Sequence, residues 1–190
     1  MRTRRARISV RAAGFTLVEL LVVLGIIAVL SAISVMVMPV ALLSAKADSG
    51  VAQLVSVLRV AREEAISQRR NVRVTFTAPN QIVISRVEVP GPAISVINQA
   101  SLESGLTFCL FGGIPDTPDA FGNAAAWSFG GAASVAFTSS GEFVDQNGDP
   151  VNGTVFIGRG NEPLSARAVS VFGPTALVRE WRWNGARWTN

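Results

Sequence analysis

Glu19 is a carboxylate inside a long apolar run, and it is the side chain of this sequence that most needs a partner. The run reads RAAGFTLVELLVVLGIIAVLSA and covers residues 11–32. A carboxylate within an apolar membrane helix costs about 2.5–3.5 kcal/mol on insertion scales, and such acids usually have a charged or polar partner. The sequence therefore predicts an ion pair at Glu19, and the cation has to be found.

Few other side chains offer acid–base, nucleophilic or metal chemistry. The chain has no histidine, which removes histidine-based catalysis, Ser-His-Asp triads and histidine metal sites. Cys109 is the single cysteine, so no intramolecular disulfide can form, and its apolar surroundings (LTFCLF) indicate a buried structural thiol. We expect a protein that is not an enzyme and that has no metal and no cofactor.

One polar stretch imitates a calcium loop. Asp145, Asn147 and Asp149 repeat the spacing of oxygen donors with which such a loop begins, but Pro150 stands where glycine is needed and Phe156 where the bidentate glutamate is needed. Asn-Gly and Asp-Pro are turn dipeptides. A polar β-turn is the favoured interpretation, and calcium binding is the alternative.

Tryptophans and arginines gather near the C-terminus, in EWRWNGARW (residues 180–188). Asn184-Gly185 predicts a two-residue type I′ hairpin turn. That turn would place Trp181 opposite Trp188. It would also place Arg182 opposite Arg187, an unfavourable pair that invites an acidic neighbour. The favoured interpretation is that the tryptophans cover the sheet against a helix. The alternative is a surface patch for nucleic acid or a partner subunit, formed by Arg179, Trp181, Arg182, Trp183, Arg187 and Trp188.

The N-terminal part of the chain reads as a membrane helix. From Leu20 to Met38 nineteen residues carry no charge, which suits the hydrocarbon thickness of about 30 Å. Five arginines precede Gly14 without an acid, and the positive-inside rule places them in the cytoplasm. The net charge of +4 belongs to this leader, because residues 15–190 carry 12 basic and 13 acidic residues. The basic balance therefore does not indicate a nucleic-acid binder.

Three interpretations of this segment compete. A cleaved secretory signal has small residues at Ser44–Ala47 (SAKA), but its apolar region would be much longer than the usual ~7–15 residues. A plain membrane anchor leaves Glu19 unexplained. In the third interpretation, GFTLVE (residues 14–19) resembles the processing motif of type IV pilins and type II secretion pseudopilins.

The pilin resemblance supplies the missing cation. In that family a prepilin peptidase cuts after the glycine and N-methylates the new N-terminus, which implies cleavage between Gly14 and Phe15. Glycine suits such a cut because it lets a protease approach the backbone closely. The amine created on Phe15 can pair with Glu19, in its own chain or in a neighbour, and offset the desolvation of the carboxylate.

The rest of the chain predicts an amphipathic helix followed by strands. Apolar residues at the i, i+3, i+4, i+7 spacing form a helical face up to about Arg69, with a weak point at Ser49-Gly50. VRVTFT and QIVISRVEV then predict a β-hairpin. Further strands are expected at 106–111, 134–138, 154–157, 168–172 and 176–183, and a long surface loop is expected at 112–134.

The β-rich part resembles the GspH/FimT subclass more than a major pilin. The resemblance rests on LVSVLRVAREEAISQRRNVRVTF, VAFTSSGEFVDQNGDPVNGTVFIG and RAVSVFGPTALVREWRW. Major pilins usually carry a disulfide-closed C-terminal loop, which one cysteine cannot make. The resemblance implies an α+β, pilin-like fold, with a long N-terminal helix, transmembrane in its first half, packed on antiparallel β-sheets.

These expectations divide the chain into a cytoplasmic leader (1–14), a transmembrane helix (15–43), an amphipathic outer half of the helix (44–70) and a periplasmic β-rich GspH-like domain (71–190). The function they imply is that of a minor pseudopilin, a structural subunit of a pilus-like filament for type II protein secretion. Its partners would be prepilin peptidase/N-methyltransferase, other minor and major subunits, and inner-membrane lipid.

Three other functions remain open from the sequence. The first is a type IV minor pilin (FimT-like) in pilus assembly or DNA uptake, with DNA as a less favoured partner. The second is a membrane-anchored enzyme, which no motif supports. The third is a carbohydrate-binding module, for which the tryptophan face is the single argument.

Overall fold

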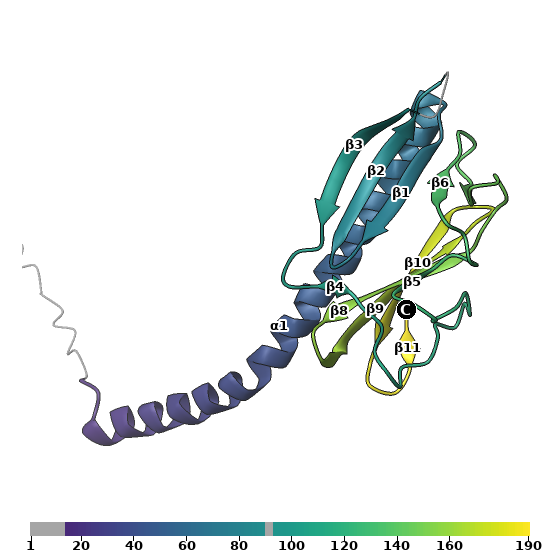
Figure 1. Ribbon diagram of the computed structural model, residues 1–190. Coiled ribbons are helices and arrows are strands. Elements are labelled where there is room, and N and C mark those ends of the chain that lie inside the picture. Colours follow the sequence, from purple (N-terminus) through teal and green to yellow (C-terminus); the bar gives the residue numbers. More distant parts are fainter. Residues whose placement is uncertain (1–13, 90–92) are drawn as a thin grey trace, which may run out of the picture. The chain divides into compact units, whose positions relative to one another are not determined.

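The computed structural model describes residues 14–89 and 93–190, which belong to two compact units with their boundary between Ala41 and Leu42. One helix, α1 (Leu17–Gln68), has residues in both units (Figure 1). The arginines of the expected leader lie outside the described residues.

In the first unit, α1 is strongly apolar, with Glu19 in its first turn. The stretch Leu17–Val35 has a mean hydropathy of 2.7 and none of it is buried. By length and composition it can cross a membrane. This stretch largely coincides with the uncharged run from Leu20 to Met38.

In the second unit, one face of α1 is buried beneath the strands. The helical stripe expected from the sequence is confirmed, because its members are 0–3% exposed: Val51, Leu54, Val55, Leu58, Ala61 and Ala65. α1 continues through Gly50, where the sequence predicted a weak point in the helix. A Cβ on Gly50 would lie 2.2 Å from Cδ1 of Leu106. The glycine therefore allows the side chain of Leu106 to pack closely against α1.

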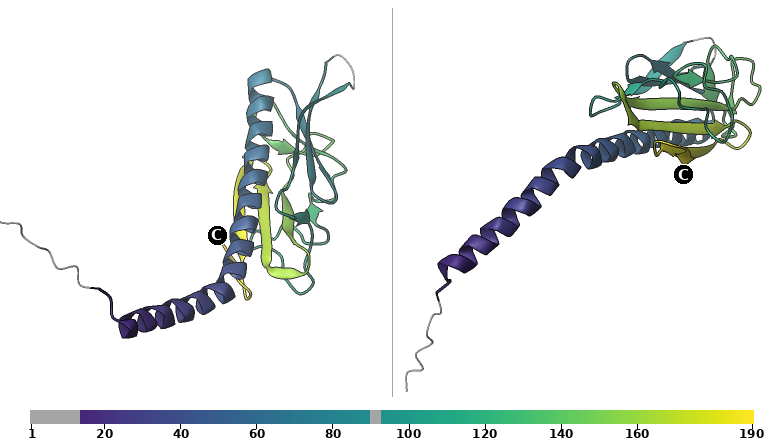
Figure 2. Two further views of the ribbon diagram at one scale, coloured as in Figure 1. Left: turned by 90° about the vertical axis from the view of Figure 1, so that its left-hand side faces the viewer. Right: turned by 90° about the horizontal axis from the view of Figure 1, so that it is seen from below.

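The strands of the second unit form two antiparallel sheets beside the outer half of α1 (Figures 1 and 2). The first sheet has the order β3-β2-β1-β6-β7, with β1 (Val72–Thr77), β2 (Gln81–Val87), β3 (Ile94–Ser101), β6 (Val135–Phe137) and β7 (Phe143–Val144). The second has the order β11-β10-β9-β8-β4, with β4 (Thr107–Phe108), β8 (Gly153–Arg159), β9 (Glu162–Phe172), β10 (Leu177–Trp183) and β11 (Trp188–Thr189). The short strand β5 (Trp127–Ser128) also pairs with β8.

The expected hairpin is confirmed as β1 and β2, and the five further strands correspond to β4, β6, β8, β9 and β10. β3 was missed because nearly all its residues are exposed, so its sequence shows no alternation of buried and exposed positions. The expected surface loop at 112–134 is partly wrong. It contains β5, and the side chains of Thr117 and Phe129 are buried in it.

The second unit has two apolar clusters, one on each face of the second sheet. The larger lies between α1 and both sheets, and it includes Leu54, Leu58, Phe137, Val155 and Val169. The smaller contains Phe156, Ala166, Ala168, Trp183 and Trp188, packed against Phe111 and Ile114 of the chain that follows β4. Strand alternation explains the division, because successive residues of β9 point to opposite faces.

Candidate functional site

The expected processing motif lies just before α1 and in its first turn. Gly14, Phe15 and Thr16 precede the helix, and the side chain of Phe15 is 76% exposed. A Cβ placed on Gly14 would meet no described atom within 4 Å. In the described part of the first unit, Gly14 and Phe15 therefore lie outside the helix and have no close neighbour at the Gly14 Cβ position.

Glu19 occupies the third position of α1, and Thr16 occupies the N-cap. The backbone N–H of Glu19 donates to Oγ1 of Thr16 at 3.2 Å, and the N–H of Leu20 donates to the Thr16 carbonyl at 3.1 Å. Thr-x-x-Glu is the sequence of a capping box. A carboxylate in the first turn also interacts favourably with the positive end of the helix dipole. The sequence reasoning missed this second role of Glu19.

In the second unit, the C-terminal hairpin differs from the expected one in its register. Trp183 pairs with Trp188, and Arg182 pairs with Thr189, so four residues rather than two form the loop. The two-residue turn is wrong because Oδ1 of Asn184 accepts the N–H groups of Ala186 and Arg187, at 3.0 and 2.9 Å. These bonds fold the loop around the asparagine side chain.

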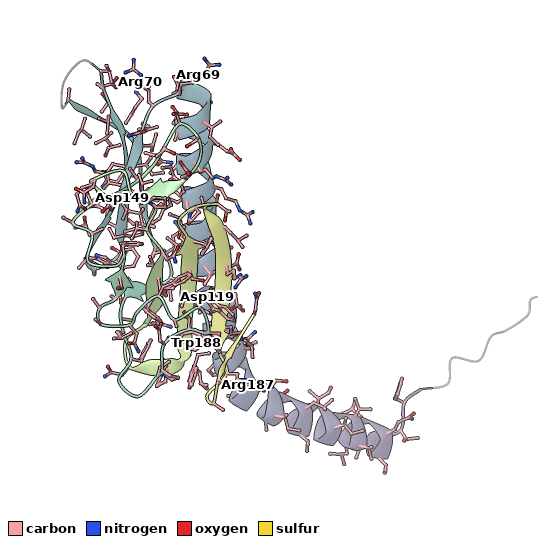
Figure 3. All side chains as sticks on the ribbon, turned by 90° about the vertical axis from the view of Figure 1, so that its right-hand side faces the viewer. Arg69, Arg70, Asp119, Asp149, Arg187 and Trp188 are labelled. Atoms are coloured by element: carbon pink, nitrogen blue, oxygen red, sulfur yellow. The ribbon has the colours of Figure 1, made fainter. Side chains whose placement is uncertain are left out.

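The tryptophans of the hairpin are packed in the smaller apolar cluster. Trp183 and Trp188 are each 8% exposed, and Trp181 is half-buried. Nε1 of Trp188, a residue labelled in Figure 3, donates to the Pro115 carbonyl at 2.8 Å. These rings therefore face the segment around residues 111–115. The favoured interpretation, which placed them against α1, is wrong in this respect. Trp183 and Trp188 also cannot offer a stacking platform to a nucleic acid.

The arginines of the predicted patch have separate surroundings. Arg187 is exposed in the hairpin loop. Arg179 forms an ion pair with Asp119 at 2.6 Å. Arg182 lies on the opposite face of the sheet from the tryptophans. On the neighbouring strand β9 its cross-strand partner is Arg167. The structure therefore does not bring the six predicted residues together into one surface.

Arg167 lies at the centre of a polar junction between α1 and β9. Its side chain is 1% exposed, and its Nε donates to Oδ1 of Asp48 at 2.6 Å. Its remaining donors reach Ser44 Oγ at 3.1 Å and the carbonyls of Leu164, Ala166 and Ser44 at 3.0–3.4 Å. A buried guanidinium needs such a set of acceptors, because its desolvation is otherwise uncompensated.

Arg182 joins the same junction from β10. Its Nη2 donates to Oγ of Ser44 at 2.8 Å, and its Nη1 lies 3.7 Å from Oδ2 of Asp48. Two adjacent arginines thus share one carboxylate and one serine of the helix. A cut near Ala45, which the secretory-signal interpretation requires, would remove Ser44 and with it acceptors of both guanidinium groups.

The sequence reasoning missed Asp48 and Arg167. A signal was nevertheless present, because Arg167 interrupts an otherwise apolar and small-residue strand at a position that alternation places on the buried face. Asp48 lies next to Ala47, which begins the buried stripe of α1. The pairing itself links residues 119 positions apart, which no local pattern reports.

Asp119 holds a second polar group, on the other face of the sheet. Its carboxylate, labelled at Asp119 in Figure 3, accepts from three donors. They are Arg179, Nε1 of Trp181 at 3.2 Å and the hydroxyl of Ser170. A groove of about 520 Å³ lies beside it, lined also by Phe121, Phe172 and Leu177. The three donors belong to β9 and β10, so the Asp119 carboxylate ties its loop to the second sheet.

The segment with the spacing of a calcium loop is a turn held by its own side chain. Oδ1 of Asp145 accepts the N–H groups of Asn147 and Asp149 at 2.8 and 3.0 Å, and its Oδ2 accepts from Nδ2 of Asn147. Within the described ranges, no group of three or more acidic, cysteine or histidine side chains could hold a metal ion. The geometry is that of the polar β-turn.

Cys109 is half-buried and lies beside β8, where its Sγ is 3.2 Å from the position of a Cβ built on Gly158. Burial raises the pKa of its thiol, and a hydrogen bond with Thr107 only partly counteracts this. A raised thiol pKa means less thiolate and a less reactive sulfur.

Two family models match the chain. Residues 10–35 match the prokaryotic N-terminal methylation motif, and residues 50–173 match the type II transport protein GspH. A comparison with curated proteins finds no match.

The chain is also similar to solved structures. One is the minor pseudopilin EpsH from the type 2 secretion system of Vibrio cholerae, with 17% identity, a TM-score of 0.49, and coverage of 72% of this chain and 97% of that one. Another is the type IV minor pilin FimU of Pseudomonas aeruginosa, with 17% identity, a TM-score of 0.48, and coverage of 75% and 97%.

Proposed function

The chain belongs to the GspH family of type II transport proteins, and from this premise we propose that it is a minor pseudopilin, cut between Gly14 and Phe15 and built into a secretion filament. The observation that carries the proposal is the pair of family matches on one chain. A methylation motif precedes a helix able to cross a membrane, and a GspH domain follows it.

The proposed topology follows from the charges. A leader of residues 1–14 stays in the cytoplasm, residues 15–43 span the inner membrane, residues 44–70 continue the helix, and residues 71–190 lie in the periplasm. The end of the candidate span at Val35, the unit boundary at Ala41 and the end of α1 at Gln68 support this division. Partners are prepilin peptidase, other pseudopilins and inner-membrane lipid.

Mass spectrometry of the protein extracted from membranes tests the processing step. We expect a chain of 176 residues (190 minus 14) that begins with N-methylated Phe15. Gly14→Val should keep the leader, since a side chain at the cut obstructs the approach of the peptidase. An intact Met1 start, or a cut near Ala45, would overturn the proposal.

Glu19 can be tested separately for its charge and for its place in the helix cap. Glu19→Gln keeps a capping-box residue but removes the charge that pairs with the amine of Phe15. We expect Glu19→Gln and Glu19→Ala to be inserted and cleaved normally, and both to be lost from filaments. Thr16→Ala, which removes only the cap, is the matched control. Normal incorporation of Glu19→Gln would refute the ion-pair argument.

A gene deletion distinguishes secretion from pilus biogenesis. Under the proposal, the deletion strain retains its exported enzymes in the periplasm and keeps its surface motility, and plasmid-borne wild type restores secretion. Loss of motility with normal secretion would instead assign the chain to a type IV pilus. The family model, whose name refers to type II transport, favours the first outcome.

A further inference from the structure

β3 is an exposed edge strand, and it is much longer than the other edge strands of this molecule. Among the described strands it pairs with β2 alone. The other strands at the ends of the sheet orders, β4, β7 and β11, have two residues each, whereas β3 has eight. Every residue of β3 except Ala100 is exposed.

The register shows which backbone groups of β3 point away from β2. The N–H of Glu88 donates to the Ala93 carbonyl, and the N–H of Leu102 donates to the Asn80 carbonyl. Hydrogen-bonded and non-hydrogen-bonded pairs alternate along an antiparallel ladder, and the bulge opposite Ser85 adds Ile97 to β3. Counting inward from both ends, the residues with outward backbone groups are Ile94, Val96, Gln99 and Ser101.

The outward group at one end of this edge is already bonded. Nε2 of Gln53, on α1, donates to the Ser101 carbonyl at 2.9 Å, and Oε1 of Gln53 accepts the N–H of Glu103. This contact confirms the counted direction of Ser101. The helix thus covers the end of β3 at Ser101, while the outward backbone groups of residues 94–99 remain without a bonded neighbour in the described chain.

The side chains along this edge do nothing to prevent pairing. Val96 is 62% exposed, Ile94 47% and Ile97 38%. No charged residue and no proline occurs in ISVINQAS, although lysines, prolines and inward charges are the usual means by which proteins protect an edge strand. Such an edge is a template for another strand.

We propose that residues 94–99 pair with an extended, uncharged segment of a neighbouring filament subunit, which adds a strand to the first sheet. This inference rests on the proposed function, because a filament supplies the neighbour. Six residues span about 20 Å, the length of a typical strand. Lipid is excluded as the occupant, since an open sheet edge has unsatisfied N–H and C=O groups that hydrocarbon cannot bond.

Filament incorporation of the full chain tests the pairing. Val96→Pro removes an outward N–H that β2 does not use, so the internal ladder is kept. We expect at least a tenfold loss of the protein from purified filaments, against less than twofold for the matched control Val96→Thr. Tryptophan fluorescence and protease resistance of the extracted protein verify the fold. If the proline variant does not fold, Val96→Lys provides the same test through charge.

Cross-linking identifies the occupant. Val96→Cys, in a Cys109→Ala chain, should form a disulfide with a cysteine placed in an extended segment of an adjacent pilin-like subunit of the assembled filament. Wild-type protein absent from filaments would mean that the proposed function fails. Wild type and Val96→Pro present in equal amounts, or no cross-link from position 96, would overturn the edge pairing and leave the proposed function intact.

Discussion

Arg167 of β9 and Asp48 of α1 form an ion pair of 2.6 Å in which the guanidinium is 1% exposed and the carboxylate 48% exposed. The cation is therefore fully dependent on its neighbours, while the anion is still partly hydrated. This asymmetry makes Asp48 the residue whose loss leaves an uncompensated buried charge.

Asp48→Ala should destabilise the second unit by about 2–3 kcal/mol, less than the ~3–5 kcal/mol of a fully buried pair because the carboxylate is half hydrated. Urea unfolding of the full chain in detergent measures this, since all four tryptophans lie in that unit. Asp48→Ala combined with Arg167→Met should recover part of the loss. Equal stability of wild type and Asp48→Ala would show that the pair is dispensable.

Gly173→Ala should destabilise the same unit by about 2–3 kcal/mol, the upper range for overpacking. The new Cβ would lie 2.5 Å from the backbone nitrogen of Val151 and 2.7 Å from its oxygen, so no side-chain rotation can relieve the clash. Gly112→Ala is the control, because nothing lies within 4 Å of its Cβ, and a change below about 0.5 kcal/mol is expected. Similar unfolding midpoints for both variants would contradict the packing at Gly173.

Trp188→Ala should cost about 3–5 kcal/mol, because the ring is buried in the smaller apolar cluster. Trp188→Phe should cost about 1–2 kcal/mol, as it loses the hydrogen bond to Pro115. The exposed Arg187, changed to alanine, serves as the neutral comparison. Were Trp188 a surface residue for ligand stacking, its removal would leave the urea midpoint unchanged.

Cys109 should react slowly with iodoacetamide at pH 8, because its raised pKa lowers the thiolate fraction. We expect alkylation of the folded chain to be at least tenfold slower than in urea. The sign for stability follows from the same shift: the unfolded thiol ionises first, so the folded unit loses stability as pH rises above the ordinary value of 9.0. Cys109→Ala should remove that loss, and equal alkylation rates with and without urea would contradict it.

Local patterns predicted much of this fold. The stripe from Val51 to Ala65 and the β1–β2 hairpin could be predicted because each depends on a period of few residues. The loop at Asn184 could not, since an Asn-Gly pair does not reveal that the asparagine side chain will accept two backbone N–H groups. β3 shows no alternation to detect, because nearly all its residues are exposed.

The candidate sites divide in the same way. Gly14, Phe15 and Glu19 lie within five positions of one another, and the resemblance of this short motif to that of pilins indicated processing. The contact of Asp48 with Arg167 joins distant strands and helix, so it required the three-dimensional structure. The neighbour of the buried tryptophans was predicted wrongly, because a sequence shows which rings share a face of a hairpin but not what covers that face.

The long separation of Asp48 and Arg167 in the chain also fixes an order of events during synthesis. The partner of Asp48 leaves the ribosome 119 residues later, and contacts of such range close slowly. Until then only strands that come earlier in the chain, such as β1 and β2, can cover the apolar stripe of α1. The junction at Asp48 is therefore a contact of this domain that closes only after β9 has been synthesised.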